Sequence, residues 1–158
     1  LTAWYGEEGK SYKFSGITLQ PEDWTKMPTI FDIKKEIEFE SLGVEFNSVL
    51  LNYYRNGRDS ISWHSDKEKE LGQNPVISSV TFGCEREFKM RRFDDNSEVH
   101  SIMLKHGSLL VMSGETQHFW QHSIPKKSLK KNSTIDLFNS EIKSGEERIN
   151  LTFRHIHR

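Results

Sequence analysis

Short stretches rich in apolar residues, separated by turn residues, recur along the chain, a pattern typical of β-strands. Glycines and the segment Asp94-Asp95-Asn96 mark turns between such stretches. In the second half, the pattern predicts strands at residues 76–82, 86–93, 99–104, 108–112, 118–122 and 148–156. So many short strands favour a β-sandwich or a β-barrel.

A helical period is found in residues 28–41, where isoleucine recurs at helical spacing with lysine and glutamate between. This spacing predicts an amphipathic helix with one buried face, which ends at Gly43. The following residues, 46–54, are rich in valine, leucine and tyrosine and predict a buried strand.

Two short aromatic segments, residues 1–6 and 11–16, flank a turn at Gly9. This arrangement predicts an N-terminal hairpin. Aromatic residues on short strands usually pack into a core. Interleaved with Lys10 and Lys13, they would also suit stacking on a nucleic-acid base beside a phosphate.

Composition narrows the functional classes. The chain has 158 residues, enough for one domain with a sizeable core, and a net charge of −1, which gives no overall attraction to nucleic acid. Cys84 is the only cysteine, so any metal must be held by histidine and carboxylate. The sequence has no long apolar run and no signal-peptide pattern, so we expect an intracellular protein without a membrane segment.

The strongest candidate chemistry lies in Ser62-Trp63-His64-Ser65-Asp66. If this segment is extended, His64 and Asp66 point to one face and can bind one ion. Far downstream, His118 and His122 would share a strand face, and either could add a second imidazole. Two histidines and one carboxylate form the facial set that holds non-haem iron with open coordination positions. A His-x-Asp motif alone also occurs by chance, usually as a loop histidine bonded to a nearby carboxylate.

The last predicted strand has an unusual polar face. Strict alternation over residues 148–154 gives one apolar face and one polar face, the latter formed by Arg148, Asn150, Thr152 and Arg154. An edge strand that faces water would explain such a face. A dicarboxylate ligand explains the two arginines better, because each guanidinium binds a carboxylate through two parallel hydrogen bonds.

Basic residues gather in two places that could contact phosphates. They are Arg86, Lys89, Arg91 and Arg92 on one predicted strand, and Lys126, Lys127, Lys130 and Lys131 in a long polar stretch. That stretch, residues 126–147, predicts a loop, and loops of such length are often lids or binding loops. The alternative is that these are solvated charges balanced by Glu85, Glu87 and Asp94.

Six motifs follow one another along the chain: Leu1-Thr2-Ala3-Trp4-Tyr5-Gly6, Phe46-Asn47-Ser48, Asn52-Tyr53-Tyr54, Trp63-His64-Ser65-Asp66, His106-Gly107-Ser108-Leu109-Leu110 and Arg148-Ile149-Asn150-Leu151-Thr152-Phe153-Arg154. Over nearly its whole length, the sequence resembles the AlkB-type Fe(II)- and 2-oxoglutarate-dependent dioxygenases, most of all the animal homologues that repair DNA and RNA. The resemblance implies a mainly β fold, a double-stranded β-helix or jelly roll. It also implies a single domain, residues 1–158, in which 1–45 form an aromatic hairpin and a supporting helix and 46–158 form the jelly-roll core with the 126–147 loop.

The resemblance implies roles for individual residues. It assigns the binding of iron to His64, Asp66 and His122, and so selects His122 over His118. The residues implied to bind the co-substrate 2-oxoglutarate are Asn52, Tyr54, Arg148, Asn150, Thr152 and Arg154. Those implied to bind the substrate base are Tyr5, Tyr12, Lys13, Phe14 and Glu68. The implied reaction uses Fe(II), O2 and 2-oxoglutarate to remove the methyl group of 1-methyladenine or 3-methylcytosine in DNA or RNA, and releases succinate, CO2 and formaldehyde.

Two departures from the family pattern concern the substrate. Relatives that invade duplex DNA insert an apolar finger from a segment ahead of the hairpin, and this sequence begins after that point, so we expect a preference for single strands. Lys67 and Glu68 follow Asp66 where relatives have an acidic residue, which leaves the preferred lesion open. Two other classes stay in view: a 2-oxoglutarate-dependent hydroxylase or demethylase of a protein or small molecule, and a jelly-roll binding module without catalysis. We expect a monomer in the cytoplasm or nucleus.

Overall fold

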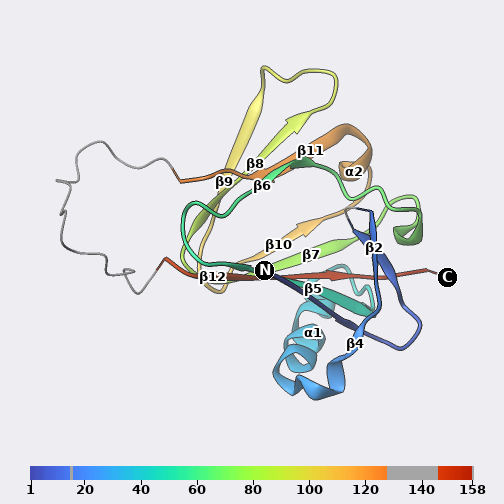
Figure 1. The fold of residues 1–158 in the computed structure, drawn as a ribbon. Helices are drawn as coiled ribbons and strands as arrows, with labels where there is room; N and C mark the ends of the chain where they lie inside the picture. Colours follow the sequence, from blue (N-terminus) through green and yellow to red (C-terminus); the bar gives the residue numbers. More distant parts are fainter. Residues whose placement is uncertain (15, 128–145, 158) are drawn as a thin grey trace, which may run out of the picture.

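Two main β-sheets lie one above the other, with a helix against the outer face of the larger sheet (Figure 1). The computed structural model describes residues 1–14, 16–127 and 146–157. The larger sheet has the order β10 (Leu109–Met112), β7 (Ile77–Gly83), β12 (Arg148–Arg154), β5 (Ser48–Tyr54), β1 (Thr2–Gly6) and β4 (Glu22–Asp23). The smaller sheet has the order β6 (Ile61–His64), β11 (Trp120–Ile124), β8 (Arg86–Arg92) and β9 (Val99–Leu104). This arrangement confirms the predicted jelly roll.

Short elements complete the described structure. They are the two-stranded ribbon of β2 (Tyr12–Phe14) and β3 (Ile17–Leu19), the helices α1 (Pro28–Glu40) and α2 (Thr116–Phe119), and the 3-10 helices η1 (Trp24–Lys26) and η2 (Lys69–Leu71). The helix predicted over residues 28–41 is confirmed as α1, with Pro28 in its first turn, where a missing backbone N–H costs nothing. None of the described helices is long and apolar enough to cross a membrane.

The larger sheet packs its two faces against different layers, and this division creates the site. On β5, Leu50 belongs to the core between the sheets, whereas Val49 belongs to the core beneath α1. On β12, Leu151 and Phe153 belong to the core beneath α1. Because successive side chains of a strand point to opposite faces, the polar residues of β12 face the smaller sheet.

The polar face of the last strand is enclosed rather than exposed to water. β12 is paired on both sides, with β5 and with β7, so the edge-strand explanation is wrong. The four polar side chains of this face are all buried: Arg148, Asn150, Thr152 and Arg154.

The predicted N-terminal hairpin is wrong in its pairing. β1 pairs with β5, which places Trp4 opposite Leu50, and β2 pairs with β3 instead. Trp4 is 4% exposed and lies in the core between the sheets. Burial of this large indole, together with the ladder to β5, outweighs a local hairpin with residues 11–16.

The two-layer packing predicts that stability depends on the α1 side of β12. Phe153→Ala should lower the free energy of unfolding by about 3–5 kcal/mol, because its ring is 0% exposed and packs against Phe46 at 6.0 Å between centroids. Ile149→Ala, on the same strand face but 42% exposed, should cost less than about 1 kcal/mol. Denaturant titration of the two variants measures both values, and equal losses would contradict this packing.

Candidate metal and co-substrate site

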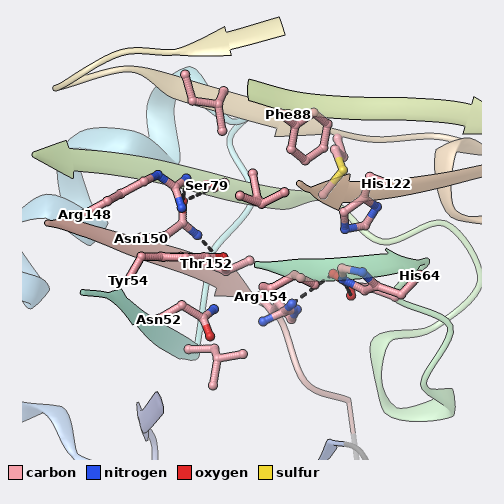
Figure 2. A pocket seen from close by; sticks show the side chains of 16 residues that line it. Asn52, Tyr54, His64, Ser79, Phe88, His122, Arg148, Asn150, Thr152 and Arg154 are labelled. Atoms are coloured by element: carbon pink, nitrogen blue, oxygen red, sulfur yellow. Dashed lines mark hydrogen bonds and ion pairs between the residues drawn. The ribbon is translucent and has the colours of Figure 1, made fainter. Parts of the chain in front are cut away.

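A cavity lined by polar and apolar side chains lies between the two sheets. Its walls come from β5, β7, β10 and β12 of the larger sheet and from β6, β8, β9 and β11 of the smaller one. Figure 2 shows His64, His122 and Arg154 at one end and Arg148 at the other, with Asn150 and Thr152 between them. With a rise of about 3.3 Å per residue, β12 separates the Cα atoms of its two arginines by roughly 20 Å.

Three side chains at one end of the cavity can hold a metal ion. His64 and His122 are cross-strand neighbours in the β6–β11 pair, and their ring centroids lie 4.2 Å apart. Asp66 follows β6, and its Oδ1 lies 3.7 Å from Nε2 of His64. The possible ligand atoms of the three residues all lie within 4.8 Å of one another. The fold therefore brings the two residues of the His-x-Asp motif together with His122, so the motif is more than a loop histidine beside a carboxylate.

The protonation states of these side chains suit metal binding. Nδ1 of His64 donates to the carbonyl oxygen of Ser62 at 2.9 Å, which leaves the lone pair of Nε2 available on the side of Asp66. Burial lowers the pKa of His122 to about 4, so its imidazole is neutral at pH 7. Burial alone would raise the pKa of Asp66, but the charge of Arg154 and its hydrogen bond to the carboxylate outweigh this effect, and the net shift is downward. Two imidazoles, one of them kept neutral by burial, and one carboxylate fit Fe(II).

The structure separates the two histidines that the sequence left as alternatives. The prediction that His118 lies on a strand is wrong, because it lies in the short helix α2. Its Nε2 contacts the carbonyl of Gln73 at 2.5 Å and Oδ1 of Asn74 at 2.9 Å. It is exposed, whereas His122 is 7% exposed and faces the cavity. The strand begins only at Trp120, because the turn after Gly114 continues into a helical turn.

Arg148 closes the far end of the cavity with unused donors. It is 1% exposed, and its Nη2 donates to Oγ1 of Thr81 at 3.0 Å and to Oδ1 of Asn150 at 2.7 Å. Its Nε and Nη1 are buried without a hydrogen-bond partner in the part of the chain that the structure describes. The ring of Tyr54 lies 4.9 Å from the guanidinium carbon. A buried cation with two unused N–H directions fits a carboxylate of a bound dicarboxylate.

A network of hydrogen bonds holds the polar face of β12 between its arginines. Oδ1 of Asn150 accepts from Oγ of Ser79 at 2.9 Å, and its Nδ2 donates to Oγ1 of Thr152 at 2.8 Å. Asn52 lies opposite Asn150 in the β5–β12 pair and also lines the cavity. The site residues predicted on β5 and β12 therefore converge on one cavity: Asn52, Tyr54, Arg148, Asn150, Thr152 and Arg154.

Ser79 and Thr81 on β7 were missed by the sequence analysis. They are buried, at 8% and 0% exposed, and they bond to the polar face of β12. A signal for them was present, because the strand carries three hydroxyl residues among apolar ones, and Ser79 and Thr81 stand at a spacing of two.

Among the residues expected to bind the substrate base, those with described side chains do not line the cavity. Tyr5 packs in the layer beneath α1, on the other side of the larger sheet from the cavity, because the alternation along β1 turns Trp4 and Tyr5 to opposite faces. The structure thus contradicts its expected role. Glu68 follows Asp66 by two residues and is partly buried, outside the cavity lining. The side chains of Tyr12, Lys13 and Phe14 lie outside the described part of the chain.

The prediction that the basic residues of β8 contact phosphates is also partly wrong. Arg86 is 1% exposed, and its guanidinium donates to three backbone carbonyls, of which the nearest are those of Pro125 at 2.6 Å and Asp59 at 2.8 Å. Lys89 pairs with Glu87 and Arg92 with Asp94, as the alternative of balanced charges expected. Arg91 stacks on the ring of Trp63, with 4.3 Å to the centroid. Lys130 and Lys131 lie outside the described residues.

The comparisons with known proteins agree with this site. Residues 2–154 match the family model described as the 2OG-Fe(II) oxygenase superfamily, and the chain belongs to that superfamily. The superfamily is named for Fe(II) and 2-oxoglutarate, and the His64–Asp66–His122 group with the unused donors of Arg148 fits both.

Individual relatives place the chain beside AlkB homologues. It is 43% identical over 166 residues to the alpha-ketoglutarate-dependent dioxygenase alkB homolog 3 of Bos taurus, an alignment that covers 99% of this chain and 51% of the relative. It is 37% identical over 161 residues to the DNA oxidative demethylase ALKBH2 of Bos taurus, with 98% and 52% covered. These findings confirm the AlkB resemblance, and the chain spans about half the length of the curated relatives it matches.

A solved structure shares the fold. "The structure of OsALKBH1" superposes with a TM-score of 0.63 at 20% sequence identity, covering 98% of this chain and 77% of that chain. At this identity the likeness supports the jelly roll and nothing finer.

The site geometry predicts which histidine binds the metal. His64→Ala, His122→Ala and Asp66→Asn should each abolish binding of Mn(II), used as a redox-stable substitute for Fe(II), because each removes one of three ligands. His118→Ala should bind Mn(II) like the unchanged chain. Calorimetric titration measures the affinity, and circular dichroism checks that each variant is folded. Metal loss in His118→Ala with retention in His122→Ala would reverse the assignment.

Proposed function

We propose that this chain removes methyl groups oxidatively from N-methylated bases such as 1-methyladenine and 3-methylcytosine in DNA or RNA. The observation that carries the proposal is that one cavity contains both groups that the reaction needs. A His–Asp–His group lies at one end, and a buried arginine with unused donors lies at the other. The similarity to proteins named alkB homolog 3 and DNA oxidative demethylase supports the choice of nucleic acid as substrate.

We propose His64, Asp66 and His122 as the ligands of Fe(II). Three protein ligands leave positions open for the co-substrate and for dioxygen. When bound, Fe(II) supplies the oxidation, in which O2, 2-oxoglutarate and the N-methyl group become succinate, CO2, formaldehyde and the unmethylated base. The protein holds the reactants in place, and the position of the cavity between the two sheets limits the access of water.

We propose that Arg148 binds the distal carboxylate of 2-oxoglutarate, with Tyr54 beside it. Arg154, whose Nη2 donates to Oδ2 of Asp66 at 2.9 Å, lies where the keto-acid end would reach the metal, together with Asn52. Asn150 and Thr152 keep the face between the two ends polar.

For the substrate base, Tyr12, Lys13, Phe14 and Glu68 remain our proposal on the family resemblance, without Tyr5. We further propose that residues 1–158 act as one dioxygenase domain, as a monomer, in the cytoplasm or nucleus where methylated nucleic acid occurs.

The direct test is mass spectrometry of oligonucleotides that carry 1-methyladenine or 3-methylcytosine. After incubation with Fe(II), ascorbate and 2-oxoglutarate, the mass of the oligonucleotide should fall by about 14 Da. This loss corresponds to one CH2 unit, because hydrogen replaces one methyl group. Asp66→Asn is the inactive control. Turnover of 2-oxoglutarate without any loss of methyl from the oligonucleotide would favour a protein or small-molecule substrate instead.

Arg148→Ala should separate the co-substrate from the nucleic acid. Loss of a charge-assisted pair worth about 1.5–3 kcal/mol should raise the apparent KM for 2-oxoglutarate roughly 10- to 100-fold. Binding of the oligonucleotide, measured by fluorescence anisotropy, should stay unchanged. Arg91→Ala, an arginine outside the cavity lining, serves as the matched control and should leave the KM for 2-oxoglutarate unchanged. Equal weakening of both ligands in Arg148→Ala would argue against this role.

Single-stranded substrate should be preferred over a matched duplex. A base inside a duplex must first be unpaired and unstacked, which costs a few kcal/mol. If about 2–4 kcal/mol of this cost falls on the transition state, the rate should differ roughly 30-fold or more. Repair rates on the two substrates of one sequence, at saturating enzyme, measure the ratio. Comparable rates would show that the protein compensates the cost of opening the duplex.

A further inference from the structure

Gln117 is a buried polar side chain that contacts a proposed metal ligand. It lies in α2 and is 2% exposed. Its Oε1 accepts a hydrogen bond from the backbone N–H of Asp66 at 2.9 Å, across 51 positions of the sequence. Its Nε2 lies 3.5 Å from Sδ of Met112. The specific contact of this amide is therefore the one to Asp66.

The backbone of Asp66 needs such a partner because the sheet no longer supplies one. The last register pair between β6 and β11 is His64 with His122, and Asp66 lies two residues beyond it. A buried backbone N–H without a partner costs free energy comparable to a lost hydrogen bond. Gln117 fills the place that a neighbouring strand would otherwise occupy.

The same bond joins the segments that carry the metal ligands. α2 runs directly into β11, so Gln117 stands five residues before His122. Its hydrogen bond fixes the Asp66 backbone relative to the His122 strand, while Arg154 holds Oδ2 of the same aspartate at 2.9 Å. With backbone and Oδ2 held, Oδ1 is left facing Nε2 of His64 at 3.7 Å.

We propose that Gln117 is a positioning residue for the metal. It sets the distance between the carboxylate of Asp66 and the two imidazoles by fixing the Asp66 backbone, and it touches neither metal nor substrate itself. The inference rests on the metal assignment proposed above. It does not depend on the identity of the methylated substrate.

Two substitutions isolate the acceptor oxygen. Gln117→Met keeps a long side chain but removes Oε1, and Gln117→Glu keeps an oxygen acceptor at the same position. Both lose the amide NH2 group that contacts Met112, so that contact does not distinguish them. His118→Ala is the matched control, because it removes the neighbouring anchor of α2, to Gln73 and Asn74, and leaves the bond to Asp66.

The measurement is calorimetric titration of Mn(II) into the metal-free full chain, with the melting temperature of the metal-free protein recorded beside it. Gln117→Met should raise the Kd for Mn(II) about 10-fold or more, as is common when a group that orients a metal ligand is lost. Gln117→Glu and His118→Ala should bind Mn(II) close to the unchanged chain, even if the buried carboxylate of Gln117→Glu lowers the melting temperature.

The proposal is overturned if Gln117→Met binds Mn(II) like the unchanged chain and only its melting temperature falls, since the role would then be structural. It is also overturned if Gln117→Glu loses as much Mn(II) affinity as Gln117→Met. Failure of the proposed function gives a different result, namely normal Mn(II) binding with no loss of methyl groups from oligonucleotides.

Discussion

The buried ion pair between Arg154 and Asp66 is the interaction on which the site depends. Both side chains are 4% exposed, and Nη2 to Oδ2 is 2.9 Å. Burial of either charge alone would cost several kcal/mol, so the guanidinium keeps the carboxylate that we propose as a metal ligand ionised before any metal binds. Arg154 comes from the larger sheet, and Asp66 follows a strand of the smaller one. The pair therefore ties the two sheets together at the end of the cavity where the His64–Asp66–His122 group lies.

This constraint explains why one strand carries both stability and chemistry. The odd-numbered side chains Leu151 and Phe153 of β12 pack in the apolar layer beneath α1. The even-numbered side chains form a hydrogen-bonded polar surface between the sheets, where an ordinary sandwich would place its apolar core. Because a polar interior is tolerated only when its groups are paired, hydroxyl residues of the neighbouring strand β7 complete the network.

Features that depend on local periodicity could be predicted from the sequence, and features that depend on distant partners could not. The common face of His64 and Asp66 and the polar face of residues 148–154 follow from a period of two. Whether Tyr5 faces the cavity depends on how β1 pairs with β5, a contact between residues more than forty positions apart. The choice of His122 over His118 depends likewise on where the helical turn after Gly114 ends, and only the family resemblance supplied it.

Two buried arginines show how the surroundings, and not the residue type, separate a structural role from a ligand-binding one. Both guanidiniums lie near the ring of Tyr54, at 5.4 Å for Arg86 and 4.9 Å for Arg148. Arg86 uses both terminal nitrogens on backbone carbonyls, so it fastens the turn after β5 to the end of β11. Arg148 donates through Nη2 to neutral side-chain oxygens and interacts with the hydroxyl of Tyr54, whereas its Nη1 and Nε meet the geometry of a hydrogen bond with no acceptor among the described residues. A buried charge left in this state is best satisfied by an anion from outside the chain, which is the role that we propose for the dicarboxylate co-substrate.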